Sequence, residues 1–186
     1  DLVRSLDVDN RADLVYARRL DEHANVETFL LALAELRDRE WRAAVVGDGP
    51  ERDAAVETAA ELRIDDRVSF LGSLPTAELV PILKGAHVFA QTATVEPFAR
   101  ELQGALACGC VGIVEYQGAA GAHELVENCE RGARVTNHQE LADEVVAAAG
   151  HDRASFNGAF AGYDHGHVID TYERVYGDER DAYGFF

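Results

Sequence analysis

The stretch Ala43-Ala44-Val45-Val46-Gly47-Asp48-Gly49-Pro50 decides the fold class, because a short apolar run ends abruptly in glycines and a proline. Residues 54–62 follow it with apolar side chains at helical spacing. The chain repeats this order of a short β-branched run and an amphipathic segment, which is typical of β-α units and a parallel sheet. We predict strands at residues 14–17, 43–46, 68–71, 87–91, 111–115 and 133–136.

Amphipathic segments between these runs predict helices at residues 26–36, 54–62 and 100–108, and two closing helices at 138–149 and 164–176. The sequence therefore predicts an α/β fold: a Rossmann-like parallel sheet of about six strands with helices on both faces. We expect residues 1–12 to be the remnant of an interdomain linker, 13–163 to be the Rossmann-like domain, and 164–186 to be a C-terminal helix and tail.

The composition is strongly acidic, with 34 acidic against 17 basic residues and a formal net charge of −17. Such a surface repels nucleic acid and anionic membranes. A hydrophobic fraction of 47% with clear periodicity argues against an acidic disordered protein. Lys84 is the only lysine. An acidic, nearly lysine-free yet globular composition indicates adaptation to high salt, where screening weakens repulsion between carboxylates.

Three cysteines without a recognisable signal peptide indicate reduced thiols and a cytoplasmic location. The spacing of Cys108-Gly109-Cys110 is too short for a zinc motif, so we expect these two thiols to pack in the core and predict no metal site. We also expect Trp41 and Tyr116 to be packing residues. The sequence contains no methionine, and we interpret it as part of a longer chain.

Four predicted strand ends lead into loops that carry arginine, glycine or glutamate. In parallel sheets the ligand lies at the carboxyl ends of the strands, where helix N-termini present N–H groups. Arginine offers phosphate a planar fork of donors, and glycine lets the backbone approach a ligand closely. The four loops together suit a phosphate-bearing ligand: Ala17-Arg18-Arg19-Leu20, Gly47-Asp48-Gly49-Pro50, Leu71-Gly72 and Val95-Glu96-Pro97-Phe98.

Each loop also has an ordinary structural interpretation when it is taken alone. The segment from Gly47 to Pro50 is then a turn, the arginine pair forms surface ion pairs, and Glu96 is a carboxylate at a helix end. The functional interpretation depends on the order of the loops, one after each of four successive strands.

This order resembles the second, donor-binding Rossmann-like domain of retaining family-4 glycosyltransferases of the GT-B architecture. The similarity runs from about residue 13 to residue 176. The matching segments are Tyr16-Ala17-Arg18-Arg19-Leu20-Asp21 with Asn25-Val26, Val45-Val46-Gly47-Asp48-Gly49-Pro50-Glu51-Arg52, Asp66-Arg67-Val68-Ser69-Phe70-Leu71-Gly72, Gly85-Ala86-His87-Val88-Phe89, Glu96-Pro97-Phe98, Ala107-Cys108-Gly109-Cys110 and His123-Glu124-Leu125-Val126.

The resemblance implies transfer of a hexosyl group from a nucleotide-sugar donor to a glycan, lipid or protein-linked acceptor. The implied reaction retains the anomeric configuration and needs no metal or other cofactor. By the same resemblance, Arg19 holds the donor diphosphate and Glu96 faces the donor sugar, and both are implied catalytic residues. The residues implied in donor binding beside them are Arg18, His23, Gly47, Gly49, Leu71, Gly72, Pro97, Phe98, Ala99 and Glu101.

The resemblance also implies two partners: the nucleoside-diphosphate sugar and an N-terminal acceptor-binding domain of the same protein. We expect the donor domain to be inactive alone. Any contact with a membrane surface is expected through the acceptor domain, because no apolar run here approaches the ~20 residues that span a bilayer.

The chain departs from the family pattern in its phosphate-binding segments. Ala24 stands where the family usually has lysine, and His23 is the nearest replacement. Arg18 stands where glycine usually precedes the arginine, and it restores a positive charge from another direction. Ala99 replaces a glycine at the start of the next helix, which narrows backbone access to phosphate.

A fourth departure concerns the ribose. Gly104 stands at the position of the family's second glutamate, and Glu101 lies one helical turn earlier, on the side from which it can substitute. The departures leave two alternatives open. One is a non-catalytic glycosyltransferase-like subunit that partners an active enzyme, and the other is a nucleotide-sugar epimerase or phosphorylase on the same fold.

Overall fold

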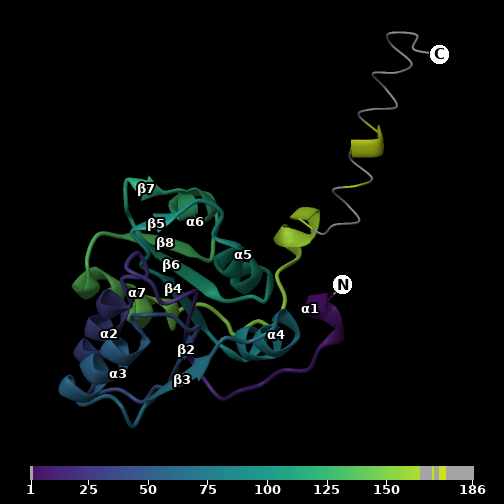
Figure 1. Ribbon diagram of the computed structural model, residues 1–186. Coiled ribbons are helices and arrows are strands. Elements are labelled where there is room, and N and C mark those ends of the chain that lie inside the picture. The colour runs from purple at the N-terminus through teal and green to yellow at the C-terminus, as the bar shows by residue number, and fades with distance from the viewer. Residues whose placement is uncertain (1, 164–168, 170–171, 175–186) are drawn as a thin grey trace.

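The computed structural model describes residues 2–163, 169 and 172–174 of the 186-residue chain. Its centre is a six-stranded parallel sheet with the strand order β3-β2-β1-β4-β6-β8 (Figure 1). A separate pair of short parallel strands, β5 and β7, lies beside it. The strands are β1 (Leu14–Ala17), β2 (Ala43–Val46), β3 (Val68–Gly72), β4 (Val88–Gln91), β5 (Val95–Glu96), β6 (Val111–Glu115), β7 (Ala119–Ala120) and β8 (Gly132–Val135).

Helices cover both faces of the main sheet (Figure 1). One layer holds α2 (Val26–Glu35), α3 (Arg52–Glu61) and α7 (His138–Ala148). The other holds α1 (Leu2–Ser5), α4 (Thr76–Gly85), α5 (Arg100–Ala107), α6 (Glu124–Glu127) and the 3₁₀ helices η1 (Gly121–His123) and η2 (Gly158–Tyr163). The predicted α/β fold with a six-stranded parallel sheet is confirmed.

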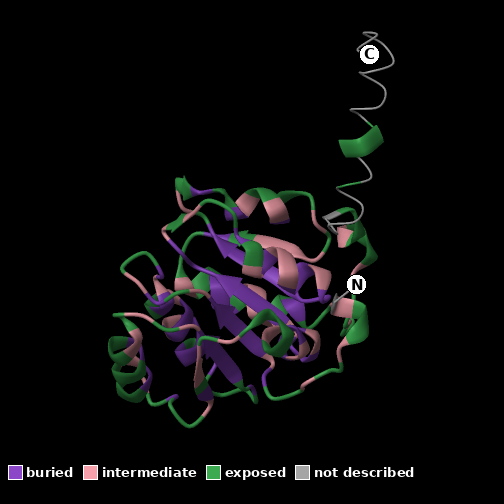
Figure 2. Ribbon diagram, turned by 45° about the vertical axis from the view of Figure 1, so that its right-hand side comes forward, coloured by how far each residue is buried: buried purple, intermediate pink, exposed green. Residues whose placement is uncertain are grey.

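The central strands β1, β2, β4 and β6 are buried at every position, which explains why their sequences are almost entirely apolar rather than alternating with polar residues. In β1, Leu14 and Tyr16 pack into the layer of α2, while Val15 and Ala17 pack into the layer of α4 and α5. Figure 2 shows this as continuous burial of the central strands beneath exposed helical surfaces. The hydroxyl of the fully buried Tyr16 donates to the carbonyl oxygen of Ala24 at 2.6 Å, which satisfies its polar group.

The predicted strands and most helices agree with the observed ones within two residues, but α4 was not predicted. Pro81 lies inside this helix and, with Pro75 before it, interrupts the sequence pattern. The helix persists because Val80, Ile82 and Leu83 are buried against the sheet. Tertiary packing therefore outweighs the local preference here.

The structure shows a helix in the segment expected to be a linker remnant, and it describes only a few positions of the segment expected to be the C-terminal helix and tail. Within the segment expected to be a linker remnant, α1 packs against α4, and Val3 and Leu6 join the core on that side. The predicted helix at 164–176 and the aromatic tail lie outside the described residues, except for positions 169 and 172–174.

The expected packing of the cysteines is confirmed, since Cys108 and Cys110 are buried free thiols. Burial raises the pKa of the Cys108 thiol to about 11, so it is protonated at neutral pH. Trp41 is buried as expected. Tyr116 is instead half exposed, and its ring contacts His123 and lies under the Arg134 guanidinium.

In the described part of the chain, we find no helix with the length and apolarity to cross a bilayer.

Candidate functional site

The strand order places a crevice between β1 and β4. The chain runs from β1 outward to β2 and β3, then returns to the other side of β1 as β4. Loops that leave the two neighbouring strands therefore diverge, and such a switch point is where open α/β sheets bind ligands. Arg18 and Arg19 follow β1, and Thr92 begins the segment that leads from β4 to Glu96.

Two glycines after β2 fix the loop that carries the arginines. A Cβ at Gly47 would lie 1.8 Å from the carbonyl oxygen of Arg18, and a Cβ at Gly49 would lie 2.2 Å from that of Leu20. Both glycines have positive φ angles, 139° and 157°. Their close approach is thus to the β1 loop itself, and backbone hydrogen bonds from Arg18 to Val46 and from Leu20 to Asp48 complete the attachment.

The end of β3 is hydrogen-bonded to the loop after β2, which in turn contacts the loop after β1. Gly72 has a φ of 69°, and its carbonyl oxygen accepts from the amide of Gly47 at 2.8 Å. Space around the Gly72 Cα is open, because an added Cβ would meet nothing within 4 Å. Neither Leu71 nor Gly72 lines the cavity that holds Arg19 and Glu96.

The turn from β5 into α5 is closed by Glu96. Its Oε1 accepts from the backbone amides of Phe98 at 3.3 Å and Ala99 at 3.0 Å. The carboxylate therefore occupies the N-terminal end of α5, where the helix dipole favours negative charge. Ala99 takes the left-handed conformation with a φ of 41°, and Phe98 is 80% exposed. Pro97 is exposed in the same turn.

The structure brings several of the predicted site residues together around one cavity of about 430 Å³. Its lining carries three arginines and two glutamates, which is a formal charge of +1 in a chain whose net charge is −17. An anion is favoured at such a positive site. The lining residues are Arg18, Arg19, Glu96, Phe98, Arg100 and Glu101.

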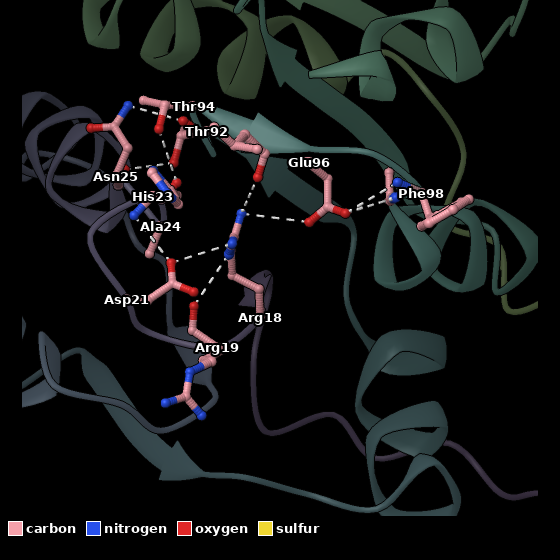
Figure 3. Close-up of polar contacts among 12 residues, drawn as sticks. Arg18, Arg19, Asp21, His23, Ala24, Asn25, Thr92, Thr94, Glu96 and Phe98 are labelled. Atoms are coloured by element: carbon pink, nitrogen blue, oxygen red, sulfur yellow. Dashed lines mark hydrogen bonds and ion pairs between the residues drawn. The ribbon is translucent and has the colours of Figure 1, made fainter. Parts of the chain in front are cut away.

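The two adjacent arginines point in different directions (Figure 3). Arg18 reaches across to Glu96, and the guanidinium of Arg19 points away from that carboxylate. Arg19 is exposed, and no hydrogen bond or ion pair with another described residue holds its side chain. Its donors are therefore free for a ligand, as are those of Arg100, the other cavity arginine without a hydrogen bond or ion pair to a described residue.

His23 and Ala24 lie outside the cavity lining. The His23 ring is half exposed and approaches Glu22 at 3.7 Å, while its carbonyl oxygen accepts from the amide of Thr94 (Figure 3). Ala24 is 1% exposed. The structure thus does not bring the expected lysine replacement to the arginines.

Glu101 and Gly104 share one face of α5. Glu101 lines the cavity, whereas Gly104 does not. A Cβ at Gly104 would meet nothing within 4 Å, so a side chain fits there without displacing neighbours. Glu101 lies in the first turn of α5, about one turn before Gly104, and its carboxylate reaches the site from there.

The structure contains a buried polar cluster of Asn25, Thr92 and Glu115 that the sequence pattern did not predict. The Asn25 Nδ2 atom donates to Glu115 Oε2 and to the Thr92 carbonyl oxygen, both at 2.9 Å, and the Thr92 hydroxyl donates back to the Asn25 carbonyl oxygen. Glu115 is 8% exposed, and burial raises the pKa of its carboxyl group. The signal available in the sequence was a carboxylate ending an otherwise apolar run, at the carboxyl edge of the sheet.

Two other cavities differ in charge. One of about 270 Å³ between α2 and α3 is lined by Asp21, Glu22, Glu27 and Glu51 without any basic residue, so it disfavours anions. Another of about 450 Å³ lies at the opposite edge of the sheet, beside Trp41, and its arginines are balanced by Asp13 and Glu40. Of the three, the cavity with Arg19 and Glu96 suits a phosphate best.

Solved structures with the same fold include nucleotide complexes. HepE of Anabaena in complex with UDP-glucose is 26% identical, with a TM-score of 0.64 over 79% of this chain and 40% of that chain. Its complex with UDP is 27% identical, with a TM-score of 0.64 over 75% and 40% of the two chains. The pneumococcal O-GlcNAc transferase GtfA in complex with UDP and GlcNAc is 17% identical, with a TM-score of 0.73 over 92% and 38%, a likeness of fold.

The chain thus spans about two fifths of the length of the HepE structures that it matches. No curated protein sequence matches it. Residues 3–152, most of the chain and all of the six-stranded sheet, match the family described as glycosyl transferases group 1. The chain therefore belongs to the glycosyl transferases group 1 family.

Proposed function

We propose that this chain is the donor-binding half of a retaining, metal-independent glycosyltransferase of family 4 and that its donor is a UDP-sugar. One observation carries the proposal: Arg19 and Glu96 line a single positive cavity at the switch point of the sheet. The UDP and UDP-glucose complexes of HepE, which is 26–28% identical, support the choice of nucleotide.

The cavity suggests a role for each group. Arg19 binds the diphosphate and neutralises the charge that develops on it as the sugar leaves, a form of electrostatic stabilisation. Glu96 faces the donor sugar, and the turn of Pro97, Phe98 and Ala99 approaches sugar and phosphate. Glu101 binds the ribose in place of the family's second glutamate, whose position Gly104 occupies.

The β3 end, with Leu71 and Gly72, lies by the base in this proposal. Open space at the Gly72 Cα leaves room for a ligand to approach the backbone there. The acceptor is bound by an additional N-terminal domain, and the protein works in a salt-rich cytoplasm, for which the charge of −17 is the supporting observation.

Calorimetric titration with UDP-glucose and UDP tests donor binding. We expect Arg19→Ala to weaken binding of both about 10- to 100-fold, the value of a charge-assisted contact to phosphate. Arg52→Ala is the matched control, because Arg52 pairs with Asp53 at 3.8 Å and lies outside the cavity lining. A folded chain that binds neither nucleotide in molar salt would contradict the proposal.

Retention is tested on the whole protein. NMR of the first product formed from UDP-glucose should show an α linkage, the configuration of the donor. A β linkage would exclude a retaining mechanism. Conversion of UDP-glucose into another UDP-sugar without an acceptor would favour the epimerase alternative.

A second candidate is a non-catalytic subunit. It is favoured by Ala24, because this buried alanine stands where the family usually has lysine and supplies no cation there. It predicts that Arg19→Ala and Glu96→Ala in the whole protein leave cellular glycans unchanged, whereas a loss of glycan would exclude it.

A further inference from the structure

Arg18 is fully engaged by the protein. Its side chain is 11% exposed. Its Nη1 atom lies 3.1 Å from the Val95 carbonyl oxygen and 3.5 Å from Glu96 Oε2, and its Nη2 atom lies 3.4 Å from Asp21 Oδ1. Its Nε donates to the Arg19 carbonyl oxygen at 3.2 Å. All three guanidinium nitrogens thus contact groups of the protein, across two loops that are 78 residues apart in the chain.

Glu96 is held from two sides. One carboxylate oxygen contacts Arg18, and the other accepts from the amides of Phe98 and Ala99 (Figure 3). Its side chain is 15% exposed, so its orientation depends on these partners rather than on water. The planar fork of arginine can contact Glu96, Val95 and Asp21 at once, which the single ammonium of lysine cannot do in this geometry.

We infer that Arg18 is a positioning residue: it aims the Glu96 carboxylate and acts on the donor through Glu96, without binding phosphate itself. The inference rests on the proposed function for its effect on a UDP-sugar. We call the contacts of the Arg18 guanidinium with Val95, Glu96 and Asp21 the Arg18 clamp. Glycine usually stands at this position in the family that the sequence resembles, so the clamp is a feature of this chain. The two consecutive arginines then have separate tasks, with Arg19 left for the diphosphate.

Loss of the clamp leaves two carboxylates without their shared cation. Asp21 and Glu96 both contact the Arg18 guanidinium. In Arg18→Met, which keeps the apolar stem, these like charges repel and Glu96 leaves the orientation that it shares with the α5 amides. Contact of Glu96 with the sugar is then weakened, and contact of Arg19 with phosphate is not.

Amide hydrogen exchange in the ligand-free protein tests the positioning directly. We expect exchange at the Ala99 amide to be about tenfold faster in Arg18→Met, the effect of weakening one hydrogen bond to a charged group. The buried amides of β1 and β6 report global stability and should not change. Arg52→Met, an arginine paired with a carboxylate elsewhere, should leave Ala99 unchanged. An Ala99 amide unaffected by Arg18→Met would overturn the inference.

Affinities for UDP-glucose and UDP then separate positioning from phosphate binding. We expect Arg18→Met to weaken UDP-glucose about tenfold and UDP much less, and to add nothing further in a Glu96→Gln background, because residues that act through one another are not additive. Equal losses for both nucleotides, multiplying with those of Glu96→Gln, would identify Arg18 as a phosphate ligand and overturn the inference. If the unmutated protein binds neither, the proposed function fails, and the exchange measurement alone decides the role of Arg18.

Discussion

At the scale of single residues, Gly47 and Gly49 show how the absence of a side chain shapes the site. They bring the β2 loop against the backbone of Arg18 and Leu20, at distances that no Cβ allows. The sequence suggested that these glycines make room for a ligand, but the backbone that they approach is that of the arginine loop. Their structural role is therefore to place Arg18 and Arg19.

Gly47→Ala should destabilise the fold by about 2–4 kcal/mol, because the new Cβ would force the arginine loop to move and would also strain a positive φ. Urea unfolding measures the change. Gly118→Ala is the control, since its Cβ would meet nothing within 4 Å, and its effect should stay within about 0.5 kcal/mol. Equal stability of the two variants would disprove the proposed contact.

The buried carboxyl group of Glu115 makes stability depend on pH. Burial raises its pKa in the folded state, and the hydrogen bonds from Gln117 and Asn25 only partly oppose this effect. The folded protein therefore holds this proton more tightly than the unfolded chain, so the contribution of Glu115 is most favourable at acid pH and is lost as pH rises through the folded-state pKa.

Glu115→Gln removes that penalty and keeps an oxygen for Asn25. We expect the variant to be more stable than the unmutated protein at pH 7.5 and the difference in Tm to vanish below about pH 4, where both states are protonated. Thermal unfolding in a series from about pH 3.5 to about pH 7.5 measures it. A variant that is less stable at pH 7.5 would show that the ionised carboxylate is the favoured form.

At the scale of elements, the sequence predicted what local patterns determine. The strand at 111–115 was predicted from its short apolar run, which the structure buries along its whole length, and α2 was predicted because its apolar residues follow the helical period. The helix with Pro81 was missed because burial against the sheet, rather than local preference, maintains it.

The sequence predicted which loops form the candidate site, but it did not predict how their side chains are oriented. The resemblance named Arg19 and Glu96, and the structure brings both to one cavity. The clamp of Arg18 joins residues 78 positions apart, and no local pattern encodes the direction of that side chain. The place of His23 beside Thr94 depends on a similar long-range contact.

The end of α3 offers a test of element energetics. Arg63 has a φ of 57°, and the amides of Arg63 and Ile64 donate to the carbonyl oxygens of Ala60 and Ala59. This is a Schellman ending, in which glycine is favoured. Arg63→Gly should raise stability by about 0.5–1 kcal/mol and the Tm by a few degrees, whereas Arg63→Ala, which keeps the strain, should not. Calorimetric Tm values decide, and a lower Tm for the glycine variant would contradict the assignment.

At the scale of the whole molecule, a small cavity with a positive lining lies within a strongly acidic chain. The net charge of −17 opposes compaction, and salt screens that repulsion, with a Debye length that falls from about 10 Å at 0.1 M to about 3 Å at 1 M. The cavity lining of three arginines and two glutamates still attracts an anion locally, because its charges would lie close to an anion bound there.

Stability should therefore rise with salt. We expect the Tm to increase by several degrees between 0.1 and 2 M KCl, with most of the rise below about 0.5 M, where the Debye length changes fastest. Thermal unfolding in a KCl series measures it. A Tm that is constant or falls over this range would show that carboxylate repulsion does not limit the fold.

The central claim, that a sugar diphosphate binds between the β1 loop and the start of α5, is tested most directly by mapping amide chemical shifts during a titration with UDP-glucose. We expect saturable shifts at Arg18, Arg19, Glu96 and residues 98–101. We expect none at Trp41, Val145, Val146 and Ala149, which line the cavity at the opposite edge of the sheet. Saturable shifts around Trp41 with none near Arg19 and Glu96 would contradict it.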